Sequence, residues 1–402
     1  MNIEAQVKRR WEAEFGLGSG PIPVRPYIDA TIFDLEVEKV WKKVWLYVGR
    51  VEEIPEVGDY KVKRISFANT SAILIRGRDQ QVRAFHNICS HRGNTVVTET
   101  GVETWGSSKA AVLSCRFHGW IYDAEGQLRS VPEEAKFSSC FDKAENGLAP
   151  IACDVWNGFI FVCLDRQPQE SLAEYLGAYA EHIGDFPYEA LTHSYSYEAV
   201  IDCNWKVAVD SFCEAYHVHT IHAGSFPNVF SSDLYNVKFF NDHRTAGVMF
   251  YNPPPATGVA KVAQERARGS LVHHANGSML PKRVNPDRRE DFSFELSVCF
   301  PHALISLAEG IWFTHEFWPL NVDQTYWIGK YYVEKPRTNS ERWALQHAVT
   351  IQRNAWLEDT ATMEDTQRAL KSGAKEFLNI QDDEILIRHQ YNVMQRHLSG
   401  KV

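Results

Sequence analysis

The pattern of apolar and polar positions divides the chain into a strand-rich part and a part with long helices. Between about residues 45 and 165, short apolar runs alternate with turn residues, as in Ser71–Ile75, Val82–Phe85 and Phe159–Val162. Runs of this length, bounded by Gly and Asp, are typical of β-strands joined by tight turns. The pattern therefore predicts a small antiparallel β domain over residues 45–165.

Longer periodic segments follow after residue 166. Helices are expected over Leu172–Ile183, Val207–His222 and Arg342–Leu370, where apolar residues recur at helical spacing. Strands are expected over Ser194–Val200, Ser293–Ala308, Ile311–Trp318 and Thr325–Val333. We predict an α+β fold overall, in which residues 1–44 and 166–402 form a larger mixed domain with an antiparallel sheet and helices.

The composition is that of an ordinary globular protein. The 402 residues are 44% hydrophobic and 23% charged, and the net charge of −9 argues against nucleic acid or an anionic membrane as a partner. No apolar run approaches the ~20 residues that a membrane-spanning helix needs. The N-terminal residues contain no apolar signal-peptide core, and their acidic residues count against an organelle transit peptide, so we expect a cytoplasmic location.

Two short motifs, Cys89–His91 and Cys115–His118, each combine one cysteine with one histidine. Both follow strand-like runs, so two loop tips can meet at one metal centre. Two thiolates and two imidazoles are the ligands of a Rieske [2Fe–2S] cluster. A zinc site uses the same residue types, but zinc fingers usually pair Cys with Cys and His with His.

The residues around both motifs resemble the Rieske signature of ring-hydroxylating oxygenase large subunits, Cys-x-His-Arg-Gly with Cys-x-x-His-Gly-Trp-x-Tyr-Asp-x-x-Gly-x-Leu. The resemblance implies that Cys89, His91, Cys115 and His118 hold a [2Fe–2S] cluster. The stretch between the motifs, residues 92–114, is longer than in most of the family, and we expect an inserted surface loop there.

The other cysteines show no close metal spacing and are expected to be buried thiols. They are Cys140, Cys153, Cys163, Cys203, Cys213 and Cys299.

A second group of ligand-type residues precedes His222. His217 and His219 lie just before it, and Glu214 lies beside them. An exposed polar helix face would explain such a run without a metal. In a regular helix, residues three or four apart share a face, so spacing alone pairs His219 with His222. His217 and His222 would lie about 140° apart around the helix.

The same segment resembles the family motif Asp/Glu-x-x-His-x(4,5)-His, whose histidines bind a mononuclear Fe(II). The resemblance selects His217 and His222 and leaves His219 aside. It requires the helix to end or distort between the two ligands, for example at a π-bulge.

A 2-His-1-carboxylate site needs one further carboxylate. In the family it comes from a distant helix near the C-terminus, here the segment Trp356–Asp365. Asp359 best matches the family position, while Glu358 and Asp365 remain rivals.

The resemblance also implies a role for Glu214. In most of these enzymes, the acidic residue at this position hydrogen-bonds an iron-binding histidine and a Rieske histidine of a neighbouring subunit, here His217 and His118. A carboxylate on an imidazole N–H fixes the tautomer and the orientation of the ring.

The resemblance extends over nearly the whole chain and includes Asn204-Trp205-Lys206 and Trp156–Val162. It implies the large (α) subunit of a Rieske non-haem iron oxygenase. In this family a separate reductase or ferredoxin supplies electrons, which reach mononuclear Fe(II) through the cluster, and O2 is activated there beside an organic substrate. A dinucleotide-binding G-x-G-x-x-G fingerprint is missing, which agrees with a separate reductase. A head-to-tail homotrimer is expected, with or without a small β subunit.

The residues leave the substrate and the reaction open. Eight aromatic side chains either line an apolar pocket for an aromatic compound or belong to the core: Phe226, Phe230, Tyr235, Phe239, Phe240, Phe250, Trp312 and Phe313. Monohydroxylation and cis-dihydroxylation remain alternatives, as does oxidative demethylation or hydroxylation of a quaternary ammonium compound in an aromatic cage.

Two readings from other classes are a Rieske electron-transfer protein without oxygenase activity and a zinc-stabilised binding protein. The first leaves the second metal site and most of the chain after residue 165 unexplained.

Overall fold

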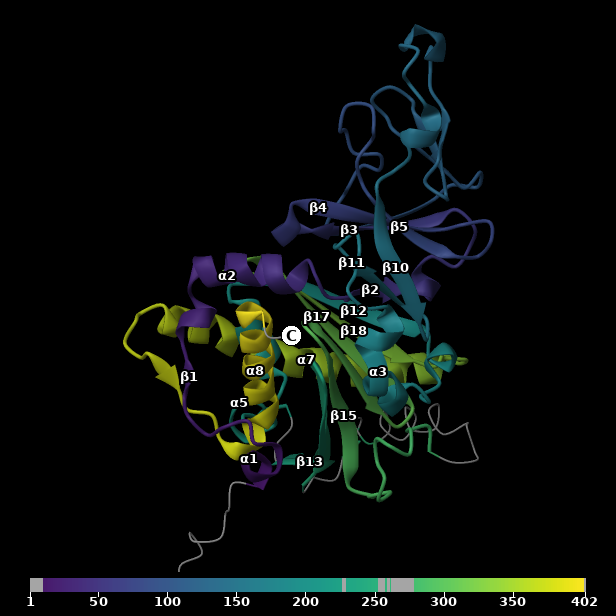
Figure 1. Cartoon of the computed structure of the whole chain (residues 1–402). Helices are drawn as coiled ribbons and strands as arrows, with labels where there is room; N and C mark the ends of the chain where they lie inside the picture. Colours follow the sequence, from purple (N-terminus) through teal and green to yellow (C-terminus); the bar gives the residue numbers. More distant parts are fainter. Residues whose placement is uncertain (1–9, 226–228, 252–256, 259–260, 262–277, 401–402) are drawn as a thin grey trace, which may run out of the picture. The chain divides into compact units, whose positions relative to one another are not determined.

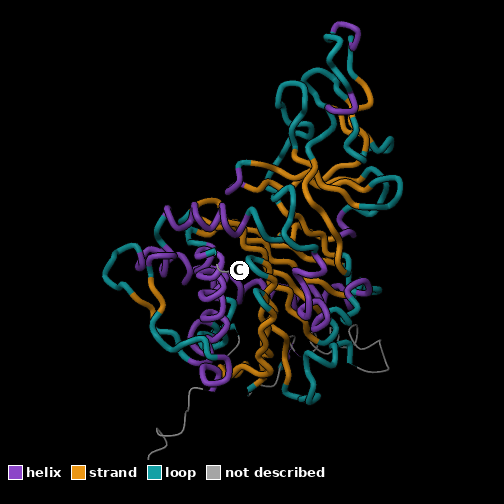
Figure 2. The backbone as a smooth tube through the Cα atoms, viewed as in Figure 1, coloured by secondary structure: helices purple, strands orange, loops and turns teal. Residues whose placement is uncertain are grey.

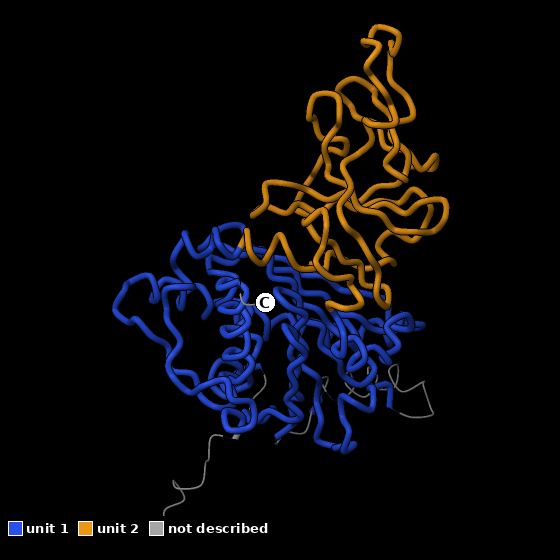
Figure 3. Tube along the Cα trace, viewed as in Figure 1, with its two compact units in different colours: residues 1–36, 176–402 blue, residues 37–175 orange. Residues whose placement is uncertain are grey.

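The computed structural model describes the chain except for residues 1–9, 226–228, 252–256, 259–260, 262–277 and 401–402. The chain forms two compact units, one of residues 37–175 and one that combines residues 1–36 with 176–402 (Figure 3). The first unit is built mainly from strands, and the second combines a sheet with long helices. The expected α+β class with antiparallel sheets is confirmed.

Seven strands form the main sheet of the unit of residues 37–175, and all neighbouring pairs are antiparallel. Their order is β2 (Leu46–Arg50), β11 (Phe159–Cys163), β10 (Pro150–Trp156), β5 (Val82–His86), β4 (Thr70–Arg76), β3 (Asp59–Ile65) and β6 (Glu103–Ser107). Strand β6 lies inside the stretch that we expected to be a surface loop. That expectation is corrected, because residues 103–107 pair with β3 and extend the sheet.

A smaller sheet of the same unit carries the second Cys-His motif. It consists of β7 (Val112–Ser114), β8 (Ile121–Asp123) and β9 (Leu128–Ser130). Trp120 and Tyr122 pack into the hydrophobic cluster that this sheet shares with the main one, and Cys89 and Cys115 belong to the same cluster. The two motifs are therefore anchored in one core.

The other unit is organised around a second antiparallel sheet of seven strands (Figures 1 and 2). Their order is β12 (His193–Ile201), β18 (Gln324–Val333), β17 (Ile311–Asn321), β16 (Ala303–Ala308), β15 (Phe292–Cys299), β14 (His243–Phe250) and β13 (Phe230–Phe240). The expected strand over Ser293–Ala308 is two strands, because the chain turns at residues 300–302 and β16 pairs back onto β15.

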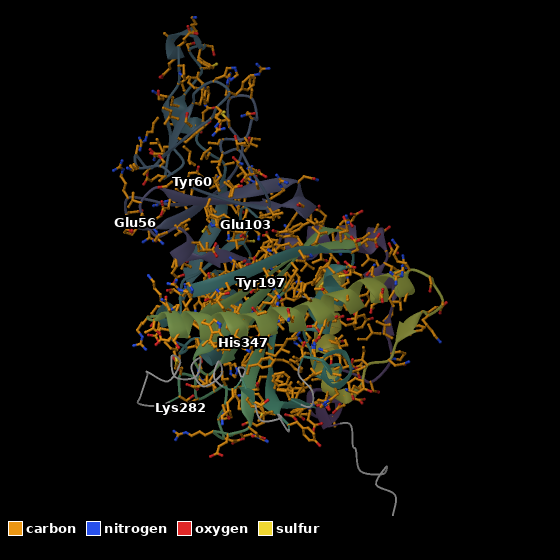
Figure 4. All side chains as sticks on the ribbon, turned by 180° about the vertical axis from the view of Figure 1, so that it is seen from behind. Glu56, Tyr60, Glu103, Tyr197, Lys282 and His347 are labelled. Carbon is orange, nitrogen blue, oxygen red and sulfur yellow. The ribbon has the colours of Figure 1, made fainter. Side chains whose placement is uncertain are left out.

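Helix α7 (Asn339–Leu370) covers this sheet. Seen from behind, it runs alongside the strand that carries Tyr197, with His347 in its first half (Figure 4). The Trp356 ring of α7 lies 6.2 Å from the ring of Tyr197 and 6.1 Å from that of Phe313. Trp312, next to Phe313, instead stacks on Tyr332 at 3.7 Å. Successive residues of β17 thus point to opposite faces of the sheet.

The remaining regular elements are short, apart from two. Helix α8 (Ile385–Ser399) and helix α3 (Leu172–Ile183) are the longer ones, and α3 is interrupted by non-helical backbone at Gly177. The short elements include α1 (Arg10–Phe15), α2 (Ala30–Glu36), a π-helical turn (Val37–Trp41), and the paired strands β1 (Ile22–Pro23) and β19 (Phe377–Leu378). Among the described residues, no helix is both long and apolar enough to cross a membrane.

The expected continuous helix over Val207–His222 is wrong. The structure has α4 (Trp205–Ser211) and the single turn α5 (Val218–Ile221), separated by irregular backbone. The Glu214 carboxylate accepts the backbone N–H groups of Tyr216 and His217, which a continuous helix would have paired with earlier carbonyls. The break places His217 and His222 at the two ends of α5.

The Asn204-Trp205-Lys206 sequence fixes the start of α4. The Asn204 side chain caps the helix by accepting the N–H of Lys206 at 3.0 Å. Trp205 Nε1 and Lys206 Nζ both donate to the buried carboxylate of Glu36, at 3.0 and 2.8 Å. This buried ion pair anchors the segment that leads to the histidines.

Candidate metal centres

The two Cys-His loops have the same backbone geometry. In the first, the N–H of Gly93 donates to the carbonyl of Cys89 at 3.0 Å, and in the second, the N–H of Gly119 donates to the carbonyl of Cys115 at 2.9 Å. Both glycines have φ of +73°, a left-handed conformation that residues with a side chain rarely adopt. The glycine of each motif therefore closes a tight loop around its cysteine.

The loops bring together four potential ligands. The two cysteines are buried, whereas His118 is exposed and His91 is half-buried. The Nδ1 atoms of His91 and His118 lie 3.1 Å apart, which suits two imidazoles on one metal, because nitrogens bound at about 2.1 Å from a metal lie about 3 Å apart. Inner thiols and outer imidazoles fit the asymmetric ligand set of a Rieske cluster.

Neighbouring groups orient this set. The ring of His91 stacks on Trp120, with centroids 4.9 Å apart. The hydroxyl of Tyr122 lies 3.1 Å from Cys89 Sγ. Burial by itself raises the pKa of Cys115, but hydrogen bonds from the backbone N–H of Phe117 and from a nearby asparagine side chain outweigh it, and the net pKa is lowered. A lowered thiol pKa favours the thiolate that binds iron.

A second constellation joins α5 to α7. Asp359 Oδ1 lies 3.4 Å from His217 Nε2 and 3.0 Å from His222 Nε2. The potential ligand atoms of these three residues all lie within 4.8 Å of one another, and Asp359 is 4% exposed. Two imidazoles and one carboxylate are the donors of a non-haem Fe(II) facial triad, which leaves coordination positions open.

The residues present fit a metal ion. Asp359 Oδ1 is buried and, apart from the two histidine Nε2 atoms, has no hydrogen-bonding partner among the described residues, although a buried carboxylate oxygen ordinarily has one. Both histidines present Nε2 to this oxygen, and their Nδ1 atoms are occupied by other groups. A cation among the three atoms would satisfy all of them.

Two further carboxylates hold the outer sides of the histidine rings. Glu214 is hydrogen-bonded to Nδ1 of His217, and Glu358 Oε2 lies 2.8 Å from Nδ1 of His222. A carboxylate can only accept, so each Nδ1 carries the hydrogen and each Nε2 is left with a lone pair for a metal. Sequence reasoning treated Glu358 as a rival ligand and missed this supporting contact.

Two other residues considered from the sequence lie outside the constellation. His219 is exposed, and its ring centroid lies 6.1 Å from that of Tyr251. Asp365 is exposed and pairs with Arg368 on the same helix. The assignment of His217, His222 and Asp359 as ligands stays a prediction that the geometry supports.

The affinity for Fe(II) is expected to rise with pH. Burial raises the pKa of Asp359; burial also opposes protonation of His217 and His222, but the adjacent carboxylates outweigh it and raise their pKa above the ordinary 6.5. Iron must displace these protons, so the association constant should increase as pH rises through and beyond 6.5 and then level off. Anaerobic calorimetry from pH 5.5 to 8.5 measures this; an affinity independent of pH would contradict it.

The Glu358→Gln substitution is expected to weaken Fe(II) binding by about 10- to 100-fold, the usual effect of removing a carboxylate that supports a metal-binding histidine. The amide can still accept from Nδ1 but lacks the charge that favours the metal-bound imidazole. Iron dissociation constants measure the effect, with Glu364→Gln as the control, because Glu364 is exposed on the same helix. Equal affinities in both variants would contradict the supporting role.

Some of the aromatic residues proposed to line a pocket lie apart, whereas Phe230, Phe250 and Phe313 are linked through the ring of Phe294. Trp312 faces away from α7, and the Phe239 ring stacks on His389 at 4.2 Å. Phe313 lies on the α7 side of the sheet, near Trp356. Phe226 lies outside the described residues. Phe313 thus contacts the helix that carries Asp359.

The remaining cysteines are partly as expected. Cys163, Cys203, Cys213 and Cys299 are buried. Cys140 is exposed and Cys153 is half-buried, which corrects the expectation for these two; Cys140 follows β9 in irregular chain, where no packed element covers it.

Comparisons with known families match both units. Residues 44–146 match the Rieske [2Fe–2S] domain, and residues 188–400 match the ring hydroxylating alpha subunit (catalytic domain). The first match selects a [2Fe–2S] cluster over zinc for the Cys-His motifs, and the second corresponds to the domain type that binds mononuclear iron.

Individual relatives act on different substrates. The chain is 37% identical over 196 residues, 48% of each sequence, to the 2-aminobenzenesulfonate 2,3-dioxygenase subunit alpha of an Alcaligenes species. It is 29% identical over 205 residues, 51% of this chain and 44% of the relative, to the glycine betaine monooxygenase oxygenase subunit of Chromohalobacter salexigens. The chain thus matches about half the length of these curated relatives.

A solved structure shares the fold of the whole chain. Naphthalene 1,2-dioxygenase from a Rhodococcus species superimposes with a TM-score of 0.75 at 21% identity, covering 98% of this chain and 99% of that one.

Proposed function

Because this chain belongs to the ring hydroxylating alpha-subunit family, with a Rieske domain ahead of the catalytic domain, we propose that it is the terminal component of an oxygenase system. It accepts electrons from a separate reductase or ferredoxin and inserts oxygen from O2 into a small organic substrate. The observation that carries the proposal is the convergence of two histidine Nε2 atoms on the buried Asp359 Oδ1, which has no other partner in the part of the chain that the structure describes.

Each group of residues has one task in this proposal. The domain of residues 45–165 holds the cluster through Cys89, His91, Cys115 and His118, and residues 1–44 with 166–402 form the catalytic domain. When bound, the cluster supplies single electrons and the mononuclear iron supplies activation of O2.

The ligand histidines are held ready by their neighbours. Glu214 and Glu358 keep the hydrogen of each imidazole on Nδ1 and orient the rings. His217, His222 and Asp359 would hold a metal ion as a facial triad, a ligand set that leaves coordination positions open for O2 and substrate.

Glu214 is also proposed to connect neighbouring subunits. Its side chain is 9% exposed and sits against His217, whereas His118 is exposed on its loop. We place His118 of one copy against Glu214 of the next in a head-to-tail homotrimer, with or without a small β subunit. The carboxylate would then hydrogen-bond the imidazoles of both metal centres and give electrons a short route between them.

The substrate is proposed to be aromatic, and the reaction to be mono- or cis-dihydroxylation in the cytoplasm, as part of aromatic hydrocarbon catabolism. The 37% identical relative is named for an aromatic sulfonate. On the side of the sheet that α7 covers, Phe313 of the sheet packs near Trp356 of α7. The alternative is oxidation of a quaternary ammonium compound, which the similarity to a glycine betaine monooxygenase subunit supports.

Metal analysis and oxygen consumption test the proposal. Anaerobically purified protein should contain two irons and two sulfides in the cluster and one further iron per chain. With a surrogate reductase and NADH, an aromatic substrate panel should give O2 consumption coupled to hydroxylated product. Zinc without sulfide would contradict the assignment of a [2Fe–2S] cluster. A full iron content with no oxygenated product from aromatic or quaternary ammonium compounds would contradict the oxygenase and favour an electron-transfer protein.

A further inference from the structure

His315 is a buried histidine with one satisfied ring nitrogen and one that lacks a partner. It lies on β17 and is 1% exposed. Its Nδ1 lies 3.0 Å from the indole Nε1 of Trp327. An indole nitrogen can only donate, so Trp327 donates and Nδ1 of His315 is the acceptor.

This hydrogen bond determines the tautomer. Burial lowers the pKa of His315 to about 3, so the ring is neutral near pH 7. A neutral imidazole whose Nδ1 accepts must carry its hydrogen on Nε2. Nε2 is buried and has no hydrogen-bond partner among the described residues. Buried donors without an acceptor are rare in folded proteins because they lose their hydrogen bond to water.

The surroundings of His315 connect the two segments that carry the proposed iron ligands. Its ring centroid lies 4.3 Å from that of Phe212, two residues before Glu214. It lies 4.6 Å from that of Trp356, one helical turn before Asp359. The free N–H therefore lies in the interior between the α4–α5 segment and α7, the two segments that carry the proposed iron ligands.

The strand pattern places His315 as one polar residue in a row of aromatic side chains. Phe313 and Phe317, two residues to either side, point to the same face as His315, with ring centroids 5.8 and 6.0 Å away. Directly opposite in register is Gly329, where a Cβ would lie 2.6 Å from Trp327 and 3.0 Å from a ring atom of Trp356. The glycine makes room for the rings that hold one polar residue in an aromatic wall.

We propose that the Nε2–H of His315 is a specificity-determining donor that binds a neutral acceptor oxygen on an aromatic substrate, such as an aryl carbonyl or aryl ether. The inference rests on the proposed function and deepens it by naming the substrate class. His315 is buried among aromatic rings, and a carboxylate brought beside it would lose its hydration without a charged partner on these rings. A quaternary ammonium group is disfavoured at this position, because it would face the positive end of an N–H bond.

Binding of two compounds of matched shape tests the proposal. Acetophenone carries a carbonyl where ethylbenzene carries a methylene. Calorimetry with the iron- and cluster-loaded protein, without reductant, should show wild type binding acetophenone about tenfold more tightly. His315→Phe should abolish the preference. His315→Gln should keep most of it, because the amide can accept from Trp327 and donate to the ligand.

His389 provides a matched control. It is also buried, with its pKa lowered to about 3, but its Nε2 donates to the carbonyl of Asn241 at 3.0 Å. His389→Phe should therefore retain the wild-type preference. Equal affinity of wild type for both compounds, failure of wild type to bind acetophenone, or a preference that survives in His315→Phe would overturn the inference. These affinities are measured without turnover, so they do not depend on whether oxygenated product forms. The role of His315 and the proposed oxygenase activity can therefore fail separately.

Discussion

The Asp359→Ala variant is expected to lose the mononuclear iron and to oxygenate substrate more than about 100-fold more slowly than wild type. Loss of a residue that only supports a metal ligand already lowers activity by up to about 100-fold, and loss of the ligand itself should cost more. Asp359 Oδ1 is the atom on which both histidine Nε2 atoms converge, at 3.4 and 3.0 Å. Two imidazoles alone leave the site without its anionic donor. Iron content should fall from about three to about two per chain, while the cluster spectrum is unchanged.

Asp365→Ala is the control for this variant. Asp365 lies six residues further along α7, with its side chain 70% exposed, and pairs with Arg368. It should retain iron and activity. Retention of the third iron in Asp359→Ala would instead transfer the ligand role to another carboxylate, and Glu358 would be the next to test because it already contacts His222.

The Cys115→Ser variant is expected to lose the [2Fe–2S] cluster and, with it, reductase-dependent turnover by more than about 100-fold, while the mononuclear iron remains. Cys115 is 2% exposed at the base of its loop, where backbone N–H groups lower the pKa of the thiol. A serine hydroxyl keeps the size but is a poor ligand for iron. Labile sulfide and visible absorption measure the loss.

Cys140→Ser is the matched control, because Cys140 belongs to the same unit but is exposed. It should keep sulfide, absorption and turnover. A Cys115→Ser protein that assembles a normal cluster would refute the ligand assignment, and a variant that loses both metals would point to unfolding of the chain.

Much of the architecture follows from local pattern. Helix α3 and strands β12, β17 and β18 lie close to where the apolar pattern places them. Half-buried and exposed residues alternate along β12, whereas β17 and β18 are buried on both faces and read as continuous apolar runs. Local pattern failed between Val207 and His222. The periodicity there is helical, but Glu214 binds the backbone N–H groups of the next turn and interrupts the helix. A side chain that accepts hydrogen bonds from backbone N–H groups does not change the spacing of apolar residues, so the spacing could not predict this break.

The sequence by itself determined the family, the ligand types and the cofactors that they imply. It could do so because the metal-binding residue types and the spacing of the motifs are read directly from short segments of the chain. Only the tertiary structure decided which atoms meet. His217 and His222 flank a single helical turn, and α7 brings a carboxylate from more than 130 residues away onto both of them. His315 is the clearest case: nothing local distinguishes it. Its Nε2–H has no partner among the described residues because Trp327 donates to the other nitrogen and the ring is surrounded by aromatic side chains from distant segments.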